Sequence, residues 1–298
     1  MTLKIFTNLL IIIFFVSSLK NIQSTSSCGD IDFDSILKDY LKNATEIDIF
    51  LDFDGTLAEI TPHPNNTVTT TSMKNTLLEL SKHPEISTTI ISGRALSDVE
   101  QKIQIDNFTY SGNHGFEILF TNGSKYIHQI PESLSANFSK LLQELEQKVE
   151  KHNAWIENKI YSLTFHYHET PEHLKRMLME QAILIVTKYG YRANQAHDAI
   201  EIKPPIQWNK GLAAEYILSH KYDDLWRNRK ILSVGDDRTD EDIMKVIKGF
   251  GLSFRVTNHN DLVTNADYKI PTVECVQELL DAINRHYLKK QSKCSCKN

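Results

Sequence analysis

Short apolar runs alternate along much of the chain with segments whose apolar residues recur at helical spacing. Each run is short enough for a buried strand and ends in a polar or glycine-containing turn. Predicted strands of this kind are 47–51, 86–91, 108–111 and 231–234. Predicted helices are about 31–41, about 71–82 and a helix that opens at Ala95. Buried strands that alternate with helices predict an α/β fold around a parallel sheet.

The pattern changes in the middle of the chain, from about residue 128. A helical segment is followed by a partly alternating stretch that predicts a strand pair. A second helix and a second strand pair come after it. These predicted elements are 134–152, 155–168, 171–189 and 191–202. Such an insertion between α/β segments predicts a smaller α+β cap domain. The predicted organisation is a leader at 1–26, a core formed by 27–127 and 204–298, and a cap at 128–203.

The predicted leader consists of Lys4, an apolar run at 9–16 and then small or polar residues up to Ser27. The run is shorter than the roughly 20 apolar residues of a membrane span, so it predicts a cleaved signal peptide and no span in the mature chain. An uncleaved anchor or a buried helix is the alternative. Several glycosylation sequons agree with a secreted glycoprotein. Their asparagines are Asn43, Asn65, Asn107, Asn122 and Asn137.

The cysteines lie towards the two ends of the chain, at Cys28, Cys275, Cys294 and Cys296. In an oxidising compartment Cys28 would join the start of the mature chain to its tail through Cys294 or Cys296, although sequence alone does not determine pairings. The alternative for the two tail cysteines is a weak metal site. Two thiols are fewer than the four ligands that are usual at such sites.

The composition is that of an ordinary soluble globular protein, with 41% hydrophobic and 24% charged residues in a chain of 298. This length is sufficient for one large or two modest domains. A net charge of -5 gives no support for nucleic-acid binding. The sequence does not indicate an oligomeric state.

The strand at 47–51 leads into two acids, Asp52 and Asp54, and then Gly55. Alternate side chains of a strand point to the same side, so both carboxylates would face one way unless the turn at Gly55 splays them. Two acids at the carboxyl end of a strand suit a metal and a phosphate. The alternative is an ordinary surface turn, because Asp and Gly are common in turns. The apolar strand directly before the two acids argues against it.

The next two strand ends also carry polar groups. Ser92 and the helix start that follows it would donate hydrogen bonds to a phosphate. Arg94 is a candidate anion partner, with a surface role as the alternative. Asn113 and His114 would line the rim of a pocket or form only a glycine-rich hairpin connection. Because open α/β sheets bind ligands at the carboxyl ends of their strands, we expect these groups to share one edge.

The segment Asp-Phe-Asp-Gly-Thr-Leu at 52–57 resembles the first motif of the haloacid-dehalogenase-like (HAD) phosphohydrolases. This resemblance implies a HAD-like Rossmannoid core. In that family the first acid attacks phosphorus, and the second protonates the leaving oxygen and later activates water. The resemblance therefore implies that Asp52 is the nucleophile and Asp54 the general acid/base. Ser92 matches the second motif, and Lys210 matches the third as a cation for the phosphate and the nucleophile.

The acid-rich run at 236–242 matches the fourth motif, and its acids would repel one another without a cation. The resemblance implies Mg²⁺ held by the Asp52 carboxylate, the Asp54 backbone carbonyl and Asp236, with Asp237 or Asp240 acting through water. Zinc is not expected at an oxygen-rich site without a nearby cysteine.

Within the superfamily, the motifs over about 48–280 most resemble trehalose-6-phosphate phosphatases. The motifs are Ser-Gly-Arg, Asn-His-Gly, Glu-Asn-Lys, Trp-Asn-Lys-Gly and Gly-Asp-Asp-Arg-Thr-Asp-Glu-Asp. The resemblance implies Mg²⁺-dependent hydrolysis of a sugar phosphate, trehalose 6-phosphate, through an aspartyl phosphate. The substrate-binding residues that it implies are Arg94, Asn113, His114, Glu157, Lys159, His197, Glu201, Asp237 and Asp240.

The cap departs from the family pattern at two places. His168 stands where an arginine is usual, and Ala196-His197 stands where Gly-Lys is usual. A neutral histidine donates only one hydrogen bond at a time, so the sugar oxygens would be held differently. The alternatives are a secreted phosphatase for another sugar phosphate and a catalytically silent secreted binding protein on the same fold.

Overall fold

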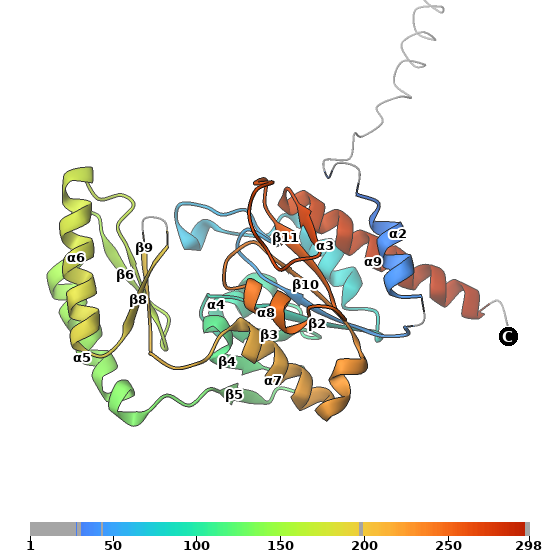
Figure 1. The fold of residues 1–298 in the computed structure, drawn as a ribbon, viewed down its shortest axis with the longest axis horizontal. Helices are drawn as coiled ribbons and strands as arrows, with labels where there is room; N and C mark the ends of the chain where they lie inside the picture. Colours follow the sequence, from blue (N-terminus) through green and yellow to red (C-terminus); the bar gives the residue numbers. More distant parts are fainter. Residues whose placement is uncertain (1–27, 29–30, 43, 197–198, 296–298) are drawn as a thin grey trace, which may run out of the picture.

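A computed structural model describes residues 28, 31–42, 44–196 and 199–295. The predicted leader and His197 lie outside the described residues. Figure 1 shows a larger body that contains most of the strands and a smaller body beside it, joined by two chain segments. Among the described residues, no helix combines the length and the apolar character needed to cross a bilayer.

The larger body, the core, is organised around an eight-stranded sheet. Its six strands from β12 to β3 run parallel, whereas β4 and β5 are antiparallel additions at one edge. In spatial order the strands are β12 (Tyr268–Ile270), β11 (Leu252–Val256), β10 (Lys230–Gly235), β1 (Ile47–Leu51), β2 (Ile86–Ile91), β3 (Thr109–Gly112), β4 (Glu117–Leu119) and β5 (Lys125–Ile127). Consequently, the two strands that end in Asp52 and Asp236 are neighbours.

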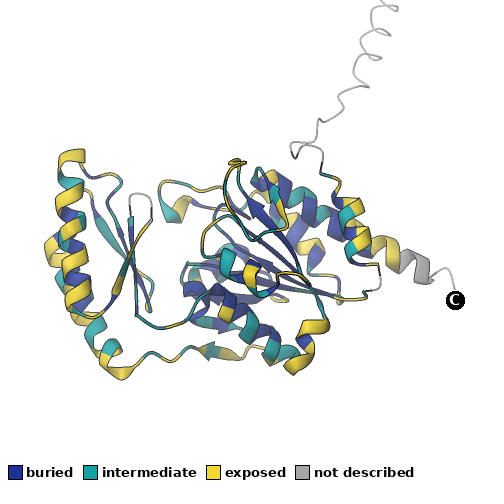
Figure 2. Cartoon of the chain, in the orientation of Figure 1, coloured by how far each residue is buried: buried dark blue, intermediate teal, exposed yellow. Residues whose placement is uncertain are grey.

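Helices cover both faces of this sheet, so the central strand β1 is buried along its whole length. Ile47, Ile49 and Leu51 pack in a cluster with one group of helices: α2 (Phe33–Tyr40), α3 (Thr71–Leu80), α4 (Leu96–Ile103) and α9 (Val273–Ser295). Phe50 points to the opposite face and packs with α7 (Lys210–Tyr222), the short helix η4 (Asp223–Asn228) and α8 (Glu241–Val246). Figure 2 shows the dark blue, buried strands between these helices.

The smaller body, the cap, is a four-stranded antiparallel sheet with two helices on one face. In spatial order its strands are β6 (Trp155–Asn158), β7 (Leu163–His166), β9 (Ala199–Lys203) and β8 (Arg192–Ala196). Helices α5 (Glu132–Val149) and α6 (Glu172–Lys188) bury leucines, isoleucines and valines against this sheet. The cap therefore has a hydrophobic core of its own.

The structure confirms the predicted fold class, an α/β core with a largely parallel sheet and a smaller α+β unit. The antiparallel strands β4 and β5 extend one edge of the predicted parallel sheet. Strands β4, β5, β11 and β12 and helices α8 and α9 are additions to the predicted elements. The turn at Asn113–Gly115 connects β3 to antiparallel β4, so it is a hairpin connection.

The predicted pairing of Cys28 with Cys294 or Cys296 is wrong, because Cys28 forms a disulfide with Cys275. Cys275 lies in the first turn of α9 with its Cα atom 5.3 Å from that of Cys28, and both residues are buried. At 1.5 Å per residue, the helix carries Cys294 about 28 Å further along its axis. Cys296 lies outside the described residues.

Candidate active site

Three acids, of which Asp52 and Asp240 are buried and Asp236 is partly buried, meet one buried lysine at the carboxyl ends of β1 and β10. The Lys210 ammonium lies 2.7 Å from Asp52 Oδ1 and 2.8 Å from Asp240 Oδ1. All three residues have exposed fractions of 5% or less. Asp236 completes a group in which one carboxylate oxygen each from Asp52, Asp236 and Asp240 lies within 4.8 Å of the others.

Local structure explains how these groups come together. Asn209 caps α7 by accepting a hydrogen bond from the Leu212 N–H, which fixes Lys210 in the first turn of the helix. A side chain at Gly55 would collide with the Asp236 carboxylate, and the positive φ of 68° at Gly55 also favours glycine. Likewise, a side chain at Gly235 would collide with Asp240.

The site contains more negative than positive charge. Burial, followed by repulsion from Asp240, raises the pKa of Asp52 well above its usual range despite the opposing effect of Lys210. The same two causes raise the pKa of Asp236 to about 7. Burial alone would lower the pKa of Lys210, but the charges of Asp240 and Asp52 outweigh burial and raise it. A divalent cation would remove this imbalance, and oxygen ligands are those that Mg²⁺ prefers. The donor set therefore fits the predicted metal.

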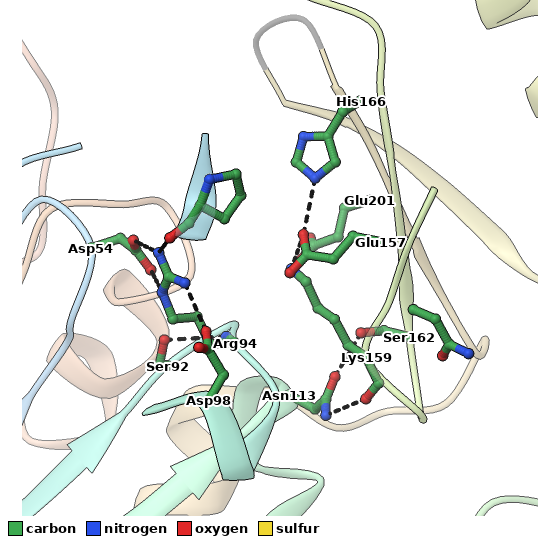
Figure 3. A network of polar contacts seen from close by, with 12 residues as sticks. Asp54, Ser92, Arg94, Asp98, Asn113, Glu157, Lys159, Ser162, His166 and Glu201 are labelled. Carbon is green, nitrogen blue, oxygen red and sulfur yellow. Dashed lines mark hydrogen bonds and ion pairs between the residues drawn. The ribbon is translucent and has the colours of Figure 1, made fainter. Parts of the chain in front are cut away.

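Asp54 lies beside this group and is held by an arginine (Figure 3). Its two carboxylate oxygens accept hydrogen bonds from Nε and Nη2 of Arg94, at 2.8 and 2.6 Å. The Arg94 side chain is only 5% exposed, whereas that of Asp54 is 37% exposed. Arg94 was expected to bind an anion of the substrate, and the structure shows that its fork already binds Asp54. The hydroxyl of Ser92 is fully buried and accepts a hydrogen bond from the Arg94 backbone N–H at 3.2 Å.

A pocket of about 1000 Å³ lies between the core and the cap. The predicted site residues along its wall are Asp52, Asp54, Arg94, His114, Glu157, Lys159, Glu201, Lys210, Asp236 and Asp237. Ser92, Asn113 and Asp240 are buried behind the wall. The pocket thus brings acids of the core and polar groups of the cap around one space.

Polar side chains of the cap face the core acids in pairs. Glu157 accepts a hydrogen bond from Nε2 of His166 at 2.9 Å, and the ammonium of Lys159 lies 3.6 Å from the same carboxylate. Figure 3 shows this group across from the Asp54–Arg94 pair. His168, which stands where the family usually has an arginine, does not line the pocket. Its Nε2 lies 3.6 Å from Glu169 Oε1.

His114 of the core contacts Glu201 of the cap, with its Nε2 2.5 Å from Oε1. Lys203 lies 2.7 Å from the other oxygen of Glu201. Burial lowers the pKa of His114, which favours a neutral imidazole that donates to the carboxylate. Burial alone would raise the pKa of Glu201, but its contacts with His114 and Lys203 outweigh burial and hold it well below its usual range. Glu201 is therefore an ionised acceptor at the pocket wall.

Asn113 forms a second link between core and cap. Its side-chain amide donates to the Lys159 carbonyl oxygen at 2.8 Å and accepts from the Ser162 hydroxyl at 2.7 Å. Asn113 and His114 both have positive φ, at 51° and 56°. Two consecutive residues in this region cost conformational free energy, and their hydrogen bonds to the cap offset it.

Some residues of the pocket wall were not predicted, namely His166, Arg192, Lys203 and Trp208. A usable signal existed for Lys203, because it lies two positions after Glu201 on a strand and so shares its face. The ring of Trp208 stacks on His128 at 3.9 Å between ring centres, which joins the two segments connecting core and cap. That contact depends on residues far apart in the sequence.

Residues 50–273 match the profile of a family described as trehalose-phosphatase. A protein of Arabidopsis thaliana, probable trehalose-phosphate phosphatase C, is 29% identical across 84% of this chain and 80% of its own length. Trehalose-phosphate phosphatase B of the same plant is 26% identical across 80% of this chain and 66% of its own length. The solved C-terminal domain of C. albicans trehalose-6-phosphate phosphatase has a TM-score of 0.70 at 21% identity, covering 84% of this chain and 96% of that domain. The structural likeness shows a shared fold.

Proposed function

Because the chain belongs to the trehalose-phosphatase family, we propose that it hydrolyses trehalose 6-phosphate to trehalose and phosphate through a phosphorylated Asp52. It is a phosphoric monoester hydrolase of that family. The observation that carries the proposal is the buried Asp52–Lys210 contact at 2.7 Å, at the wall of a pocket that the cap also lines.

In the first half of the proposed reaction, a carboxylate oxygen of Asp52 forms a bond to phosphorus while the bond from phosphorus to the sugar oxygen breaks. Asp54 gives a proton to that oxygen, which leaves as the sugar hydroxyl. Lys210 offsets negative charge at the nucleophile and on the transferring oxygens. This role agrees with the position of its ammonium between two buried carboxylates.

In the second half, Asp54 takes a proton from a water molecule, whose oxygen attacks phosphorus and releases phosphate and the Asp52 carboxylate. Asp54 is suited to both tasks because its carboxylate is partly exposed to the pocket. Asp52, Asp236 and the Asp54 backbone carbonyl would hold Mg²⁺, with Asp240 and Asp237 near them. The bound metal would offset the charge of the acids and of the phosphate oxygens.

The cap supplies the groups proposed to recognise the sugar. Glu157 and Glu201 offer acceptors for sugar hydroxyls, while Lys159 and Lys203 offer donors, and all four lie on the pocket wall. Polar groups of this kind discriminate strongly once a bound sugar covers them, because a sugar without the matching hydroxyl leaves them unpaired. We therefore assign substrate choice to the cap and bond cleavage to the core.

The test is phosphate release from a panel of sugar phosphates, with Mg²⁺ or with a chelator. We expect metal-dependent release, with the highest kcat/KM for trehalose 6-phosphate. A higher kcat/KM for another sugar phosphate would assign the site to that substrate. Release from none of them would favour a silent binding protein on this fold.

We further propose that the chain folds in the secretory pathway. The buried Cys28–Cys275 disulfide supports this, because such bonds persist in oxidising compartments. Among the described residues, the sequon asparagines Asn65, Asn107 and Asn122 are exposed, and Asn137 is partly exposed. Expression in a eukaryotic cell should give a chain in the medium whose mass falls on treatment with an N-glycosidase. Retention inside the cell without glycan would contradict the proposal.

A further inference from the structure

We propose that Arg94 is a positioning residue that orients the Asp54 carboxylate for proton transfer. This inference rests on the proposed function, which assigns the general acid/base role to Asp54. Both oxygens of Asp54 are bound by the guanidinium group, in a two-point contact of 2.8 and 2.6 Å. A two-point contact fixes the plane of a carboxylate, whereas a single hydrogen bond leaves it free to rotate.

Arg94 is itself fixed from several sides. Its Nη1 donates to Asp98 Oδ2 at 2.7 Å, and its Nη2 also donates to the Pro64 carbonyl oxygen at 2.9 Å. The guanidinium carbon lies 5.2 Å from the centre of the Phe53 ring. Asp98 lies in the first turn of α4, and Pro64 begins the short helix η2 (Pro64–Asn66) in the connection that follows β1. The orientation of Asp54 therefore depends on a rigid support.

The contacts of Arg94 also argue against a direct role in binding phosphate. A guanidinium group has five N–H donors, and the described contacts to Asp54, Asp98 and Pro64 occupy four of them. The side chain is 5% exposed. Binding a phosphate in the two-point manner typical of arginine would require Arg94 to release an acid. The geometry points instead to action through Asp54.

If Arg94 orients Asp54, its loss should matter more for a leaving group that needs a proton. If Arg94 binds the phosphate directly, its loss should affect all phosphate esters alike. A sugar hydroxyl needs a proton as it departs, whereas the phenolate of p-nitrophenyl phosphate departs without one. The ratio kcat/KM covers only the steps up to departure of the leaving group. Loss of the general acid's orientation should therefore reduce kcat/KM for the sugar phosphate much more than for the aryl phosphate.

The experiment compares Arg94→Lys with the unaltered chain on both substrates. Lysine retains a positive charge but cannot make the two-point contact. We expect kcat/KM for the sugar phosphate to fall about 10²-fold, the lower range for general acid–base catalysis, and that for p-nitrophenyl phosphate to fall less than about 10-fold. Equal falls for the two substrates would overturn the inference, because binding of the shared phosphate, or general damage, would affect both.

A matched control is available at the other end of β1. Arg229 donates to Asp48 Oδ2 at 2.6 Å and to Glu46 Oε2 at 2.7 Å. Neither acid lines the pocket. Arg229→Lys should lower Tm while the ratio of the two kcat/KM values stays that of the unaltered chain. A change in that ratio as large as that of Arg94→Lys would also overturn the inference.

A crystal structure of Arg94→Lys gives a reading that does not depend on turnover. We expect the Asp54 carboxylate to leave its present orientation or to occupy several orientations. An unchanged single orientation would overturn the inference even if the enzyme were impaired. Inactivity of the unaltered chain on every sugar phosphate would instead refute the proposed function, and the crystal structure would still decide whether Arg94 orients Asp54.

Discussion

The two ends of strand β1 both carry a buried acid paired with a cation, but only one end carries surplus negative charge. At the amino end, Asp48 accepts hydrogen bonds from Arg229 at 2.6 Å and from Tyr222 at 2.8 Å. At the carboxyl end, Asp52 shares Lys210 with a second acid, and a third lies beside them. Both acids are at most 5% exposed, so burial alone does not distinguish the two ends.

The difference lies in the balance of charge. The amino end needs no ligand, because the buried Asp48 carboxylate has both Arg229 and a hydroxyl, and Glu46, the other acid on Arg229, is 53% exposed to solvent. At the carboxyl end, the pKa of Asp52 and that of Asp236 are raised by burial and by repulsion from Asp240. Such a group is stable only with a bound proton or cation. This difference in charge supports the proposal that the carboxyl end binds a cation, and it assigns no such need to the amino end.

The largest expected effect is on turnover. Asp52→Asn should reduce phosphate release by about 10⁴-fold or more, because it replaces the attacking carboxylate with a neutral amide that is a poor nucleophile. Asp48→Asn, on the same strand, should lower the free energy of unfolding but leave kcat of the folded fraction unchanged. Phosphate release and thermal unfolding, measured on both variants, check this. Comparable losses of kcat in the two variants would erase the distinction between the ends.

The next effect is on stability and its rescue by metal. Lys210→Met leaves Asp52 and Asp240 without their cation, so we expect a loss of about 3–5 kcal/mol in the free energy of unfolding, the range for broken buried ion pairs. Arg229→Met should also destabilise the chain. Adding Mg²⁺ should recover part of the loss in Lys210→Met and none in Arg229→Met. Denaturant unfolding with and without Mg²⁺ measures both, and equal recovery would contradict the comparison.

A smaller effect concerns metal removal and pH. The pKa of Asp236 is about 7 in the folded chain against 3.8 for a free side chain, so the folded state holds a proton that the unfolded state releases. In the metal-free chain, the contribution of protonated Asp236 to the free energy of unfolding is therefore lost as pH rises from about 4 to 7. Mg²⁺ at about 100 times its Kd should add about 2.7 kcal/mol. Its effect on Tm should be larger at about pH 7.5 than at about pH 5.5, because at low pH it competes with the proton.

The matched variant for this prediction is Asp236→Asn. It removes one ligand and the repulsion together, so it should raise Tm in the presence of a chelator and abolish the increase on adding Mg²⁺. Scanning calorimetry at the two pH values gives both readings. An increase in Tm with Mg²⁺ that survives the substitution would place the metal elsewhere.

The smallest effect is expected at the amino end of β1. Tyr222→Phe removes the hydroxyl that donates to Asp48 at 2.8 Å. Hydrogen bonds to charged groups contribute about 1.5–3 kcal/mol, so a loss of that size in the free energy of unfolding is expected. Chemical denaturation measures the loss, and kcat/KM should be unchanged. A change in kcat/KM without a change in stability would connect this end to catalysis.

The sequence was sufficient to predict which edge of the sheet carries the acids and the lysine, because local patterns determine it. An apolar run buries β1, its end places Asp52 and Asp54, and Asn209 starts the helix that carries Lys210. The α+β cap followed from the change in pattern near residue 128. These features depend on neighbours in the chain, which a sequence displays directly.

Other features depend on partners far apart in the chain and were not predicted. The contact between His114 and Glu201 joins residues 87 positions apart, and the Cys28–Cys275 disulfide spans 247. Sequence indicated that Arg94 is a cation near the site, but not that Asp54 uses its fork. Tertiary packing decides which of several possible partners each polar group meets.

The most direct test of the account is the identification of a phosphorylated residue. The Asp54→Asn variant should react with p-nitrophenyl phosphate, whose leaving group needs no proton, but should hydrolyse the intermediate slowly. After acid quenching, peptide mass spectrometry should find one phosphoryl group on the peptide that contains Asp52, and none in the variant that also carries Asp52→Asn. The unaltered chain must release phosphate for the test to count. If it does, a phosphoryl group on a residue other than Asp52, or no phosphoryl group in the Asp54→Asn variant, would contradict the central claim.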